Sequence, residues 1–323
     1  ADAYGLGAVP VARALEPMDV WGFGIAAVRE GEELRAAGIR RPILVFTPLL
    51  PSEFAEVRRL GLTPTLGDPA AIAAWVESGG GPWHLAIDTG MSRAGVPWRE
   101  VGGIAGAVAS SPPTGAFTHF HSAERNDGSM DVQQERFRGA LEALGTPIPL
   151  LHAENSPGLE RQSPSPWSFA RPGVFLYGVG GDDGSAVQPQ PVANLRARIV
   201  ELRTLEDGDT VSYGATYRAH GQRRIATLAV GYADGYRRSL SNRGEVLVHG
   251  RRVPVAGMVT MDMTMVDVST VSCHVGDVAT LIGGDGDELI DVNTVARLAE
   301  LSPYEILVGL RLRVPRRYTG GEG

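Results

Sequence analysis

The pattern of hydrophobic and polar positions changes once along the chain, at about residue 185. Before that point, short apolar runs of strand length alternate with segments whose apolar residues recur at helical spacing. The apolar runs predict strands at 20–26, 42–47, 62–66, 84–88, 115–121, 149–152 and 174–177. The segments between them predict helices at 28–37, 52–60, 69–77, 101–109 and 131–144.

Strand and helix units that follow one another about every 20 to 30 residues predict a parallel sheet covered by helices. Seven or eight such units favour a (β/α)8 barrel of the TIM type, an α/β fold. We expect the first strand of that barrel to precede Ala1. An open, doubly wound sheet is the alternative architecture for the same pattern.

Beyond a stretch rich in Gly, Asp, Pro and Gln at 180–191, which we interpret as a linker, the pattern is that of a mostly β domain. The predicted strands are 195–202, 224–230, 245–249, 252–255, 263–268 and 277–282, separated by Gly, Asp and Pro turns. One helix is predicted at 292–301, with Asp291 as its N-cap. The sequence therefore predicts a barrel domain at 1–185 and a C-terminal β domain at 186–323.

Composition narrows the class of protein. Hydrophobic residues make up 43% and charged residues 21%, as in globular proteins with a large core, and no apolar run of about 18 residues predicts a membrane span. A net charge of −7 without a long basic run argues against a nucleic-acid partner. The single cysteine, Cys273, excludes an intrachain disulfide and fits a reducing compartment, so we expect a cytoplasmic protein. The acidic turns at 206–209 and 284–288 lack the ligand spacing of an EF-hand, and we predict no metal site.

Polar side chains occur where the predicted barrel strands end, which is where barrel enzymes carry their active sites. One such histidine or arginine alone indicates little, because it is more often a core or surface residue. Several strand ends with compatible groups indicate a site. The set is Tyr4, Arg93, His119, Asn155 with Ser156, and Arg171.

Two of these segments have features of a phosphate site. Ser156 followed by Pro157 predicts a helix start with Ser156 as N-cap, and a helix N-terminus offers free N–H groups to an anion. The backbone N–H groups of Gly173 and Val174 could add further donors. Spacing alone equally allows two ordinary loops.

These segments, in this order, resemble the alanine racemase family over nearly the whole chain. The motifs that carry the resemblance are Ala1-Asp2-Ala3-Tyr4-Gly5, the segment 84–95 with Arg93-Ala94-Gly95, Thr118-His119-Phe120, His152 with Asn155-Ser156, Arg171-Pro172-Gly173, Ser212-Tyr213-Gly214, Gly231-Tyr232-Ala233-Asp234-Gly235-Tyr236, Met261-Asp262 and Arg313-Val314-Pro315-Arg316. The resemblance implies an isomerase that uses pyridoxal 5'-phosphate (PLP) to interconvert L- and D-alanine, supplying D-alanine for peptidoglycan.

The resemblance also implies roles for residues. In the family a Lys that binds the cofactor stands directly before Ala-(Asn/Asp)-Ala-Tyr-Gly, and the 323 residues contain no Lys, so we expect that Lys directly before Ala1. Tyr213 of the partner subunit would be the second proton-transfer group, which makes the enzyme a homodimer with composite sites. A free Tyr titrates near 10, so it needs positive neighbours to act as a base, and His119 between Tyr213 and Arg171 could supply that help.

The remaining implied roles concern binding. Arg171 would face the pyridine nitrogen and keep it largely unprotonated, because guanidinium holds its proton. Arg93 would bind the substrate carboxylate, and Met261 and Tyr232 would bound the substrate pocket. The cofactor phosphate would be held by Tyr4, Asn155, Ser156, Gly173 and Val174.

Three departures from the family pattern affect the details. Ala86 stands where many relatives have a carbamylated Lys that braces the arginine equivalent to Arg93. Leu312 stands where a phosphate-contacting Tyr is usual, and Leu6 replaces a His. The alternatives to an alanine racemase are a racemase of broader range on the same scaffold, a PLP-binding barrel without turnover, and a PLP decarboxylase, whose signature motifs are absent.

Overall fold

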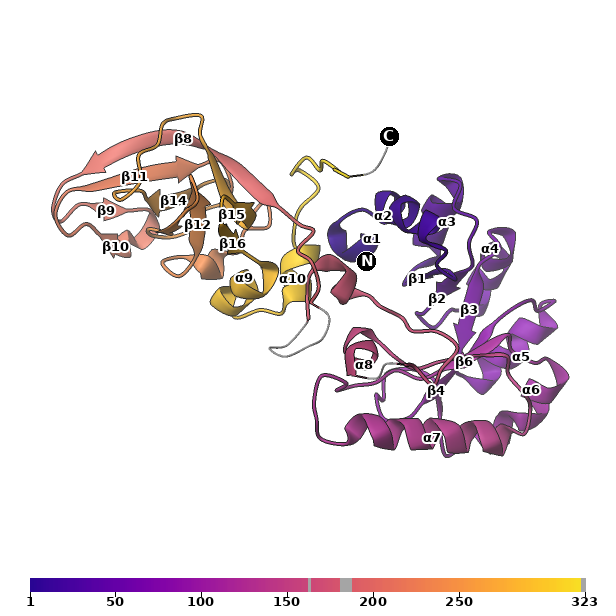
Figure 1. The fold of residues 1–323 in the computed structure, drawn as a ribbon. Helices are drawn as coiled ribbons and strands as arrows, with labels where there is room; N and C mark the ends of the chain where they lie inside the picture. The colour runs from indigo at the N-terminus through magenta and orange to yellow at the C-terminus, as the bar shows by residue number, and fades with distance from the viewer. Residues whose placement is uncertain (162–163, 181–187, 321–323) are drawn as a thin grey trace. The chain divides into compact units, whose positions relative to one another are not determined.

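The structure, a computed structural model, describes residues 1–161, 164–180 and 188–320 (Figure 1). Its described residues form two compact units. The first comprises Ala1–Asp2 and Gly7–Phe175, and the second comprises residues from Gln188 onward together with Ala3–Leu6 and Leu176–Val179. The predicted domain boundary between residues 185 and 186, and most of the predicted linker, lie outside the described residues.

The first unit is built on a parallel sheet whose strand order follows the chain, β1-β2-β3-β4-β6-β7, with β5 paired to β4. Its strands are β1 (Phe23–Ile25), β2 (Ile43–Val45), β3 (Thr63–Leu66), β4 (His84–Asp88), β5 (Val96–Pro97), β6 (Gly115–Phe117) and β7 (Leu150–His152). A doubly wound sheet would reverse its strand order once, whereas sequential order with one crossover hand puts every helix on the same face. The barrel-type α/β class is confirmed.

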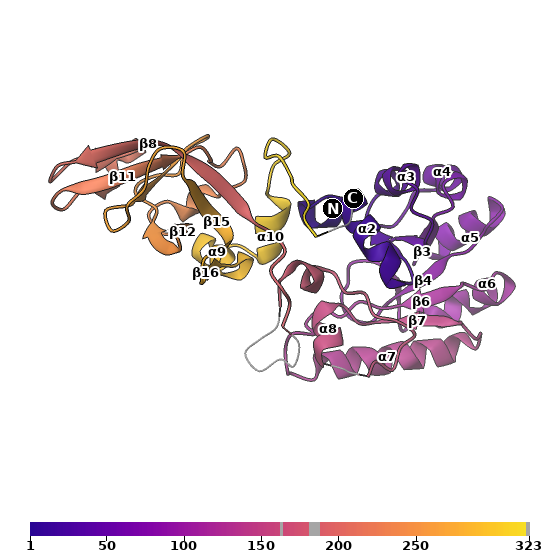
Figure 2. The same cartoon turned by 45° about the horizontal axis from the view of Figure 1, so that its top comes forward.

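Helices cover the outer face of this curled sheet (Figure 2). They are α2 (Ala8–Leu15), α3 (Val28–Ala36), α4 (Phe54–Arg59), α5 (Pro69–Glu77), α6 (Ala105–Ser110) and α7 (Ser129–Leu144), with 3-10 turns η1 (Glu16–Met18), η2 (Pro51–Glu53) and η3 (Val101–Ile104). Helix α8 (Ser156–Arg161) and the 3-10 turn η4 (Val174–Tyr177) come after β7 in the chain. Local chemistry explains α5: the Asp68 carboxylate accepts from the Ala71 N–H at 2.9 Å, Pro69 opens the helix, and Ile72 and Trp75 are buried against the sheet.

One predicted strand is wrong. Residues Val174–Tyr177 form the 3-10 turn η4 instead. The N–H of Gly173 donates to Ser156 Oγ at 2.9 Å and that of Phe175 to the same oxygen at 3.4 Å. Because these N–H groups donate to one hydroxyl, they cannot form the hydrogen bonds that would pair this segment with a neighbouring strand.

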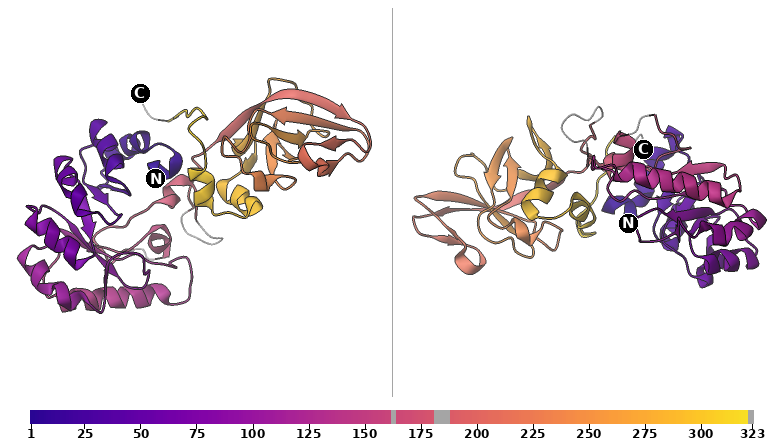
Figure 3. Two further views of the ribbon diagram at one scale, coloured as in Figure 1. Left: turned by 180° about the vertical axis from the view of Figure 1, so that it is seen from behind. Right: turned by 90° about the horizontal axis from the view of Figure 1, so that it is seen from below.

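The second unit has an antiparallel sheet of order β13-β12-β15-β8-β11-β14, with β16 on β15, and a two-stranded ribbon of β9 and β10 (Figure 3). Its strands are β8 (Leu195–Leu205), β9 (Thr210–Val211), β10 (Tyr217–Arg218), β11 (Arg223–Leu228), β12 (Glu245–Val248), β13 (Arg251–Pro254), β14 (Thr264–Asp267), β15 (Val278–Asp285) and β16 (Glu288–Ile290). Leu195, Ala197 and Ile199 of β8 are buried and alternate with exposed residues, the pattern of a sheet with one covered face. The mostly β character predicted for this region is confirmed.

Helices of the second unit are α9 (Val292–Ala299) and α10 (Pro303–Val308), with 3-10 turns η5 (Tyr213–Ala215) and η6 (Arg238–Leu240). Asp291 caps α9 as predicted, accepting from the Thr294 N–H at 2.7 Å. Helix α10 was not predicted, although Ser302 and Glu305 form a capping box around its first turn. None of the helices in the described part of the chain is long and apolar enough to cross a bilayer.

Candidate functional site

Three histidines and Arg171 form one hydrogen-bonded group in the first unit. His84 is the first residue of β4, His119 follows β6 and His152 is the last residue of β7. Arg171 Nη1 lies 2.8 Å from His152 Nδ1, and His152 Nε2 lies 2.9 Å from His84 Nδ1. Arg171 Nη2 donates to the carbonyls of Thr118 at 2.8 Å and Ala153 at 2.9 Å, and lies 3.4 Å from His119 Nδ1. We call Arg171, His152 and His84 the relay.

The hydrogen-bond directions within the relay follow from Arg171. A guanidinium can only donate, so His152 Nδ1 must be an acceptor and carries no proton. A neutral His152 then has its proton on Nε2, which donates to His84 Nδ1. His84 must therefore have its own proton on Nε2, and one arginine sets the tautomers of two histidines.

Burial keeps these histidines neutral. His152 is stacked between Phe117 at 5.1 Å and Phe169 at 4.4 Å, ring centre to ring centre. Burial and the Arg171 charge lower the pKa of His84 to about 4, and the same two causes with His84 hold the pKa of His152 well below its ordinary value.

His119 has the same character. Burial, then the charges of Arg171 and Arg93, lower the pKa of its imidazole to about 4. Arg93, on the segment that follows β4, therefore lies near His119. The expectation that His119 supplies positive charge is corrected: it is neutral at pH 7 and can offer only an N–H, while the fixed charge is that of Arg171.

These depressed pKa values predict that stability falls on mild acidification. Each imidazole titrates near 6.5 when unfolded and near 4 when folded, so between pH 7 and pH 5 the unfolded chain binds more protons. We expect the free energy of unfolding, measured by denaturant, to drop by about 4 kcal/mol over that window through His84 and His119, with a further drop through His152, whose pKa is also lowered. His119→Asn should remove about 2 kcal/mol of this drop. An identical pH profile in the variant would contradict the assignment.

The guanidinium nitrogens of Arg171 differ in their hydrogen bonding within the described residues. Among the described residues Nε makes no hydrogen bond, whereas Nη1 and Nη2 are used within the protein. Burial lowers the pKa of Arg171 to about 9, opposed by the charge of Glu154, so the group stays protonated at pH 7. Glu154 is 0% exposed, and burial raises its pKa, opposed by Ser165 and by the charge of Arg171. The arrangement is a fixed N–H donor beside a buried carboxyl.

The hydrogen bonds of the predicted phosphate segment differ from the prediction. Asn155, not Ser156, caps α8: its Oδ1 accepts from the Gly158 N–H at 3.1 Å. Ser156 Oγ is used by the N–H groups of Gly173 and Phe175, so the two predicted phosphate segments are joined to each other. Ser156 and Val174 are buried. If an anion bound here, the Gly173 N–H would donate to the anion in place of Ser156 Oγ.

Tyr4 belongs to the second unit. Its ring lies 5.0 Å from that of Tyr177 and 5.8 Å from that of Tyr304. Asp2, Ala3 and Tyr4 all have positive φ, and Arg316 Nη2 donates to the Gly5 carbonyl at 2.8 Å. The backbone around Tyr4 is thus held in a sparsely populated conformation by the C-terminal segment.

Tyr213 is 74% exposed on a strained loop of the second unit. Ser212 and Ala215 have φ of 63° and 48°, in the left-handed region that costs a non-Gly residue about 1–3 kcal/mol. Ser212 Oγ donates to the Met258 carbonyl at 2.8 Å, which fastens the loop to the segment before Met261. A side chain held outward at such a cost is a candidate for function.

Met261 and Tyr232 lie on two segments that are fastened together. The N–H of Tyr232 donates to the Thr260 carbonyl at 3.0 Å. Arg313 bridges the same segments, with Nε 2.8 Å from Asp234 Oδ1 and Nη2 2.8 Å from Asp262 Oδ1. Both predicted pocket residues are exposed, Tyr232 at 39% and Met261 at 54%, and so is Leu312 at 84%.

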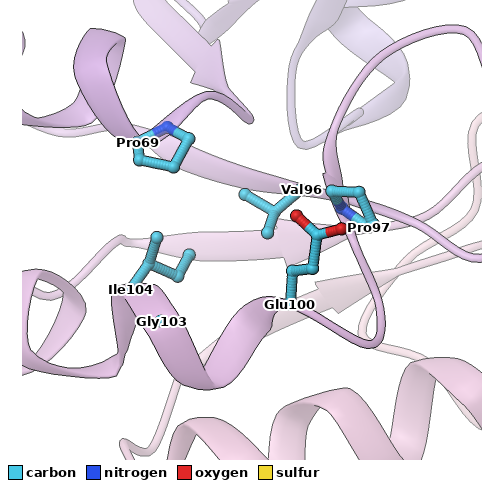
Figure 4. Close-up of a pocket in the computed structure, with 6 residues that line it drawn as sticks. All are labelled: Pro69, Val96, Pro97, Glu100, Gly103 and Ile104. Atoms are coloured by element: carbon cyan, nitrogen blue, oxygen red, sulfur yellow. The ribbon is translucent and has the colours of Figure 1, made fainter.

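A cavity of about 410 Å³ lies elsewhere in the first unit, lined by Pro69, Val96, Pro97, Glu100, Gly103 and Ile104 (Figure 4). It contains none of the predicted site residues. No group of three or more His, Cys, Asp or Glu side chains suited to a metal occurs among the residues that the structure describes.

Within the first unit, the structure brings together His119, Arg171 and Arg93, and joins Ser156 to Gly173. Tyr4, Tyr213, Tyr232 and Met261 belong to the second unit. Sequence reasoning gave His84 no role and omitted Gln133, which is 1% exposed and bonded to the ends of β4 and β6. The sequence does contain one indication of this role, because Gln133 is a polar residue on the apolar face of the helix predicted at 131–144.

Two family models cover most of the chain: "Alanine racemase, N-terminal domain" matches residues 1–180, and "Alanine racemase, C-terminal domain" matches residues 192–318. An alanine racemase of Halothermothrix orenii is 38% identical over 333 residues, covering 98% of this chain and 88% of that protein.

Solved structures agree. Alanine racemase from E. faecalis superposes with a TM-score of 0.92 at 31% identity, covering 98% of this chain and 88% of that one. Alanine racemase from Bartonella henselae, solved with covalently bound pyridoxal phosphate, has a TM-score of 0.89 at 26% identity, with 98% and 90% covered.

Proposed function

This chain belongs to the alanine racemase family, and from that premise we propose how its residues interconvert L- and D-alanine with PLP. The observation that carries the proposal is the state of Arg171. Its Nη atoms are bonded within the protein, while Nε makes no hydrogen bond among the described residues. A donor that keeps its proton suits an unprotonated ring nitrogen, so the residues fit the cofactor.

The cofactor phosphate would be held by Ser156 with the backbone of Gly173 and Val174, supported by Asn155 and Tyr4. Ser156 already gathers two N–H groups at its hydroxyl, which is where an anion would find donors. When bound, PLP withdraws electrons from the substrate and makes its α-hydrogen acidic.

The chain's own residues would orient the substrate and move the proton. Arg93 would bind the substrate carboxylate through its planar fork. Tyr213 would take or give the proton on one face of the α-carbon, because racemisation needs acid–base groups on both faces. His119, neutral at pH 7, would orient the Tyr213 oxygen with its N–H rather than with a charge.

We propose that Tyr213 acts in the site of a partner subunit, so that a homodimer carries two composite sites. Its 74% exposure and the strain of its loop support this role, since a tyrosine held outward at an energetic cost is available to a second subunit. We further propose that the enzyme is cytoplasmic and supplies D-alanine for peptidoglycan.

The second candidate is a racemase of broader amino-acid range. Met261 and Tyr232, which we propose bound the substrate pocket, are 54% and 39% exposed. A pocket with fewer large contacts discriminates weakly between side chains of similar size.

The test is turnover by the protein as its gene encodes it. With PLP, we expect D-alanine to form from L-alanine at a higher kcat/KM than for any other L-amino acid in a panel that includes serine and valine. After borohydride reduction, peptide mapping should place the cofactor on the Lys predicted directly before Ala1. Equal rates across the panel would support the broader racemase. No turnover of any amino acid would refute both candidates, and cofactor attached at another residue would refute the predicted attachment.

A further inference from the structure

Gln133 is a buried amide whose polar atoms are all bonded to the ends of two sheet strands. It lies on α7, the long helix on the outer face of the sheet (Figure 1), and is 1% exposed. Its Nε2 lies 3.0 Å from the His119 carbonyl and 3.1 Å from Thr89 Oγ1, and its Oε1 lies 3.0 Å from the His121 N–H.

The orientation of this amide has one solution. The His121 N–H can only donate, so the atom facing it must be Oε1, and the His119 carbonyl can only accept, so Nε2 faces it. The second Nε2 hydrogen goes to Thr89 Oγ1. Thr89 Oγ1 also shares a hydrogen bond of 2.6 Å with Thr118 Oγ1, in which either hydroxyl can donate. Both Nε2 hydrogens and the Oε1 atom of Gln133 therefore have a partner.

These bonds hold the backbone of His119 from both sides. The carbonyl before it, that of Thr118, accepts from Arg171 at 2.8 Å, and its own carbonyl accepts from Gln133. With both peptide groups fixed, the imidazole is directed at Arg171, 3.4 Å away. The direction of the His119 ring is thus set from α7 as well as from Arg171.

The same helix holds the start of the Arg93 segment. Arg136, one turn after Gln133, donates from Nη1 to the Thr89 carbonyl at 2.8 Å. Asp88 Oδ1 accepts from the N–H groups of Gly90 at 2.9 Å and Ser92 at 3.0 Å, so the turn that leads to Arg93 is closed from its own side. Helix α7 therefore joins the segments that carry His119 and Arg93.

We propose that Gln133 is a positioning residue for racemisation. It directs the His119 ring at Arg171, and it fixes Thr89, at the start of the segment that carries Arg93. The inference rests on the proposed function for its effect on turnover. Its structural part, the direction of the His119 ring, stands independently of turnover.

The test is Gln133→Glu, with Gln134→Glu as the matched control. The control places the same charge at the neighbouring position of α7, where Gln134 is 3% exposed and its Oε1 is unbonded among the described residues. In Gln133→Glu, a protonated carboxyl can accept from His121 and donate to His119, whereas an ionised one would face the His119 carbonyl without a proton. Burial and that carbonyl favour the protonated form, so the substituted carboxyl should ionise only as pH rises.

We expect kcat/KM of Gln133→Glu, relative to wild type, to be near one at pH 6 and about tenfold lower at pH 9. The Gln134→Glu ratio should not change with pH. By NMR, the His119 ring resonances of Gln133→Glu should match those of wild type at pH 6 and depart from them at pH 9, because the ring moves away from Arg171 once the carboxyl ionises. The Gln134→Glu resonances should match wild type at both pH values.

Two results would overturn the inference: a flat activity ratio in a folded Gln133→Glu protein, or His119 ring resonances that still match wild type at pH 9. If the wild-type protein does not racemise alanine, the proposed function fails, and the NMR comparison alone still decides whether Gln133 positions the His119 ring. Thermal unfolding of both variants checks that the comparison is between folded proteins.

Discussion

Mixing inactive Arg93→Leu and Tyr213→Phe variants should restore about a quarter of wild-type activity, although each variant alone should fall by about 100- to 10,000-fold. If Tyr213 serves the partner's site, a mixed dimer has one site with both defects and one with neither. Random exchange makes half of the dimers mixed, and half of their sites are intact. Both positions are largely exposed, so neither substitution removes core packing.

The control is the double variant, Arg93→Leu with Tyr213→Phe, mixed with wild-type protein under the same exchange conditions. Each site in that mixed dimer carries one defect, so activity should fall below the simple average of the two proteins. Exchange itself is followed by mass spectrometry of differently tagged subunits. Proven exchange without recovery would place Tyr213 in the site of its own chain and refute the composite dimer.

Arg171→Gln should lower kcat/KM for alanine by about 100- to 1,000-fold, the range seen when one preorganised donor is lost from an active site. A neutral amide removes the charge that we propose faces the ring nitrogen, and leaves the Thr118 and Ala153 carbonyls without the Arg171 guanidinium as donor. The pKa values of His84, His119 and His152 should rise, because the Arg171 charge lowers each of them. NMR titration of the histidines measures this directly.

Arg35→Gln is the matched control for that substitution. Arg35 also donates to four partners, the carbonyls of Leu60, Ile39, Arg41 and Gly61, but none belongs to the site. It should lower the unfolding temperature with little effect on kcat. If Arg171→Gln behaves the same way, losing stability but keeping kcat/KM, Arg171 is structural and its role toward the cofactor is wrong.

The sequence predicted those elements whose signals are local. Strand β4 and helix α5 have the predicted bounds, because His84–Asp88 is a short buried run and Asp68-Pro69 marks a helix start. Helix α10 carried an equally local signal in its capping box and was missed.

The errors arose where backbone N–H groups form hydrogen bonds with a residue that is not near them in sequence. Residues Val174–Tyr177 are apolar enough for a strand, but the Ser156 hydroxyl, far away in sequence, takes the backbone donors near them. The same bonds leave Ser156 unable to cap its helix, and Asn155 caps it instead. Periodicity contains no information about such competition.

Site residues could be named from the family motifs, but their protonation states could not. Only the burial of His119 beside Arg171 and Arg93 shows that it is neutral at pH 7. Gln133 illustrates a second limit, since its importance depends on three partners from two other strand ends. The roles assigned to Tyr4, Arg93, Tyr213, Tyr232 and Met261 remain predictions.

The relay has a consequence for proton conduction. Its hydrogen bonds all run one way, from Arg171 through His152 to His84. A Grotthuss transfer along it would have to begin with deprotonation of Arg171 or end with a doubly protonated buried histidine, and burial opposes the charged form of both imidazoles. The relay is therefore a proton insulator: it can hold a dipole at the site, but it cannot carry away a proton that racemisation must return to its substrate.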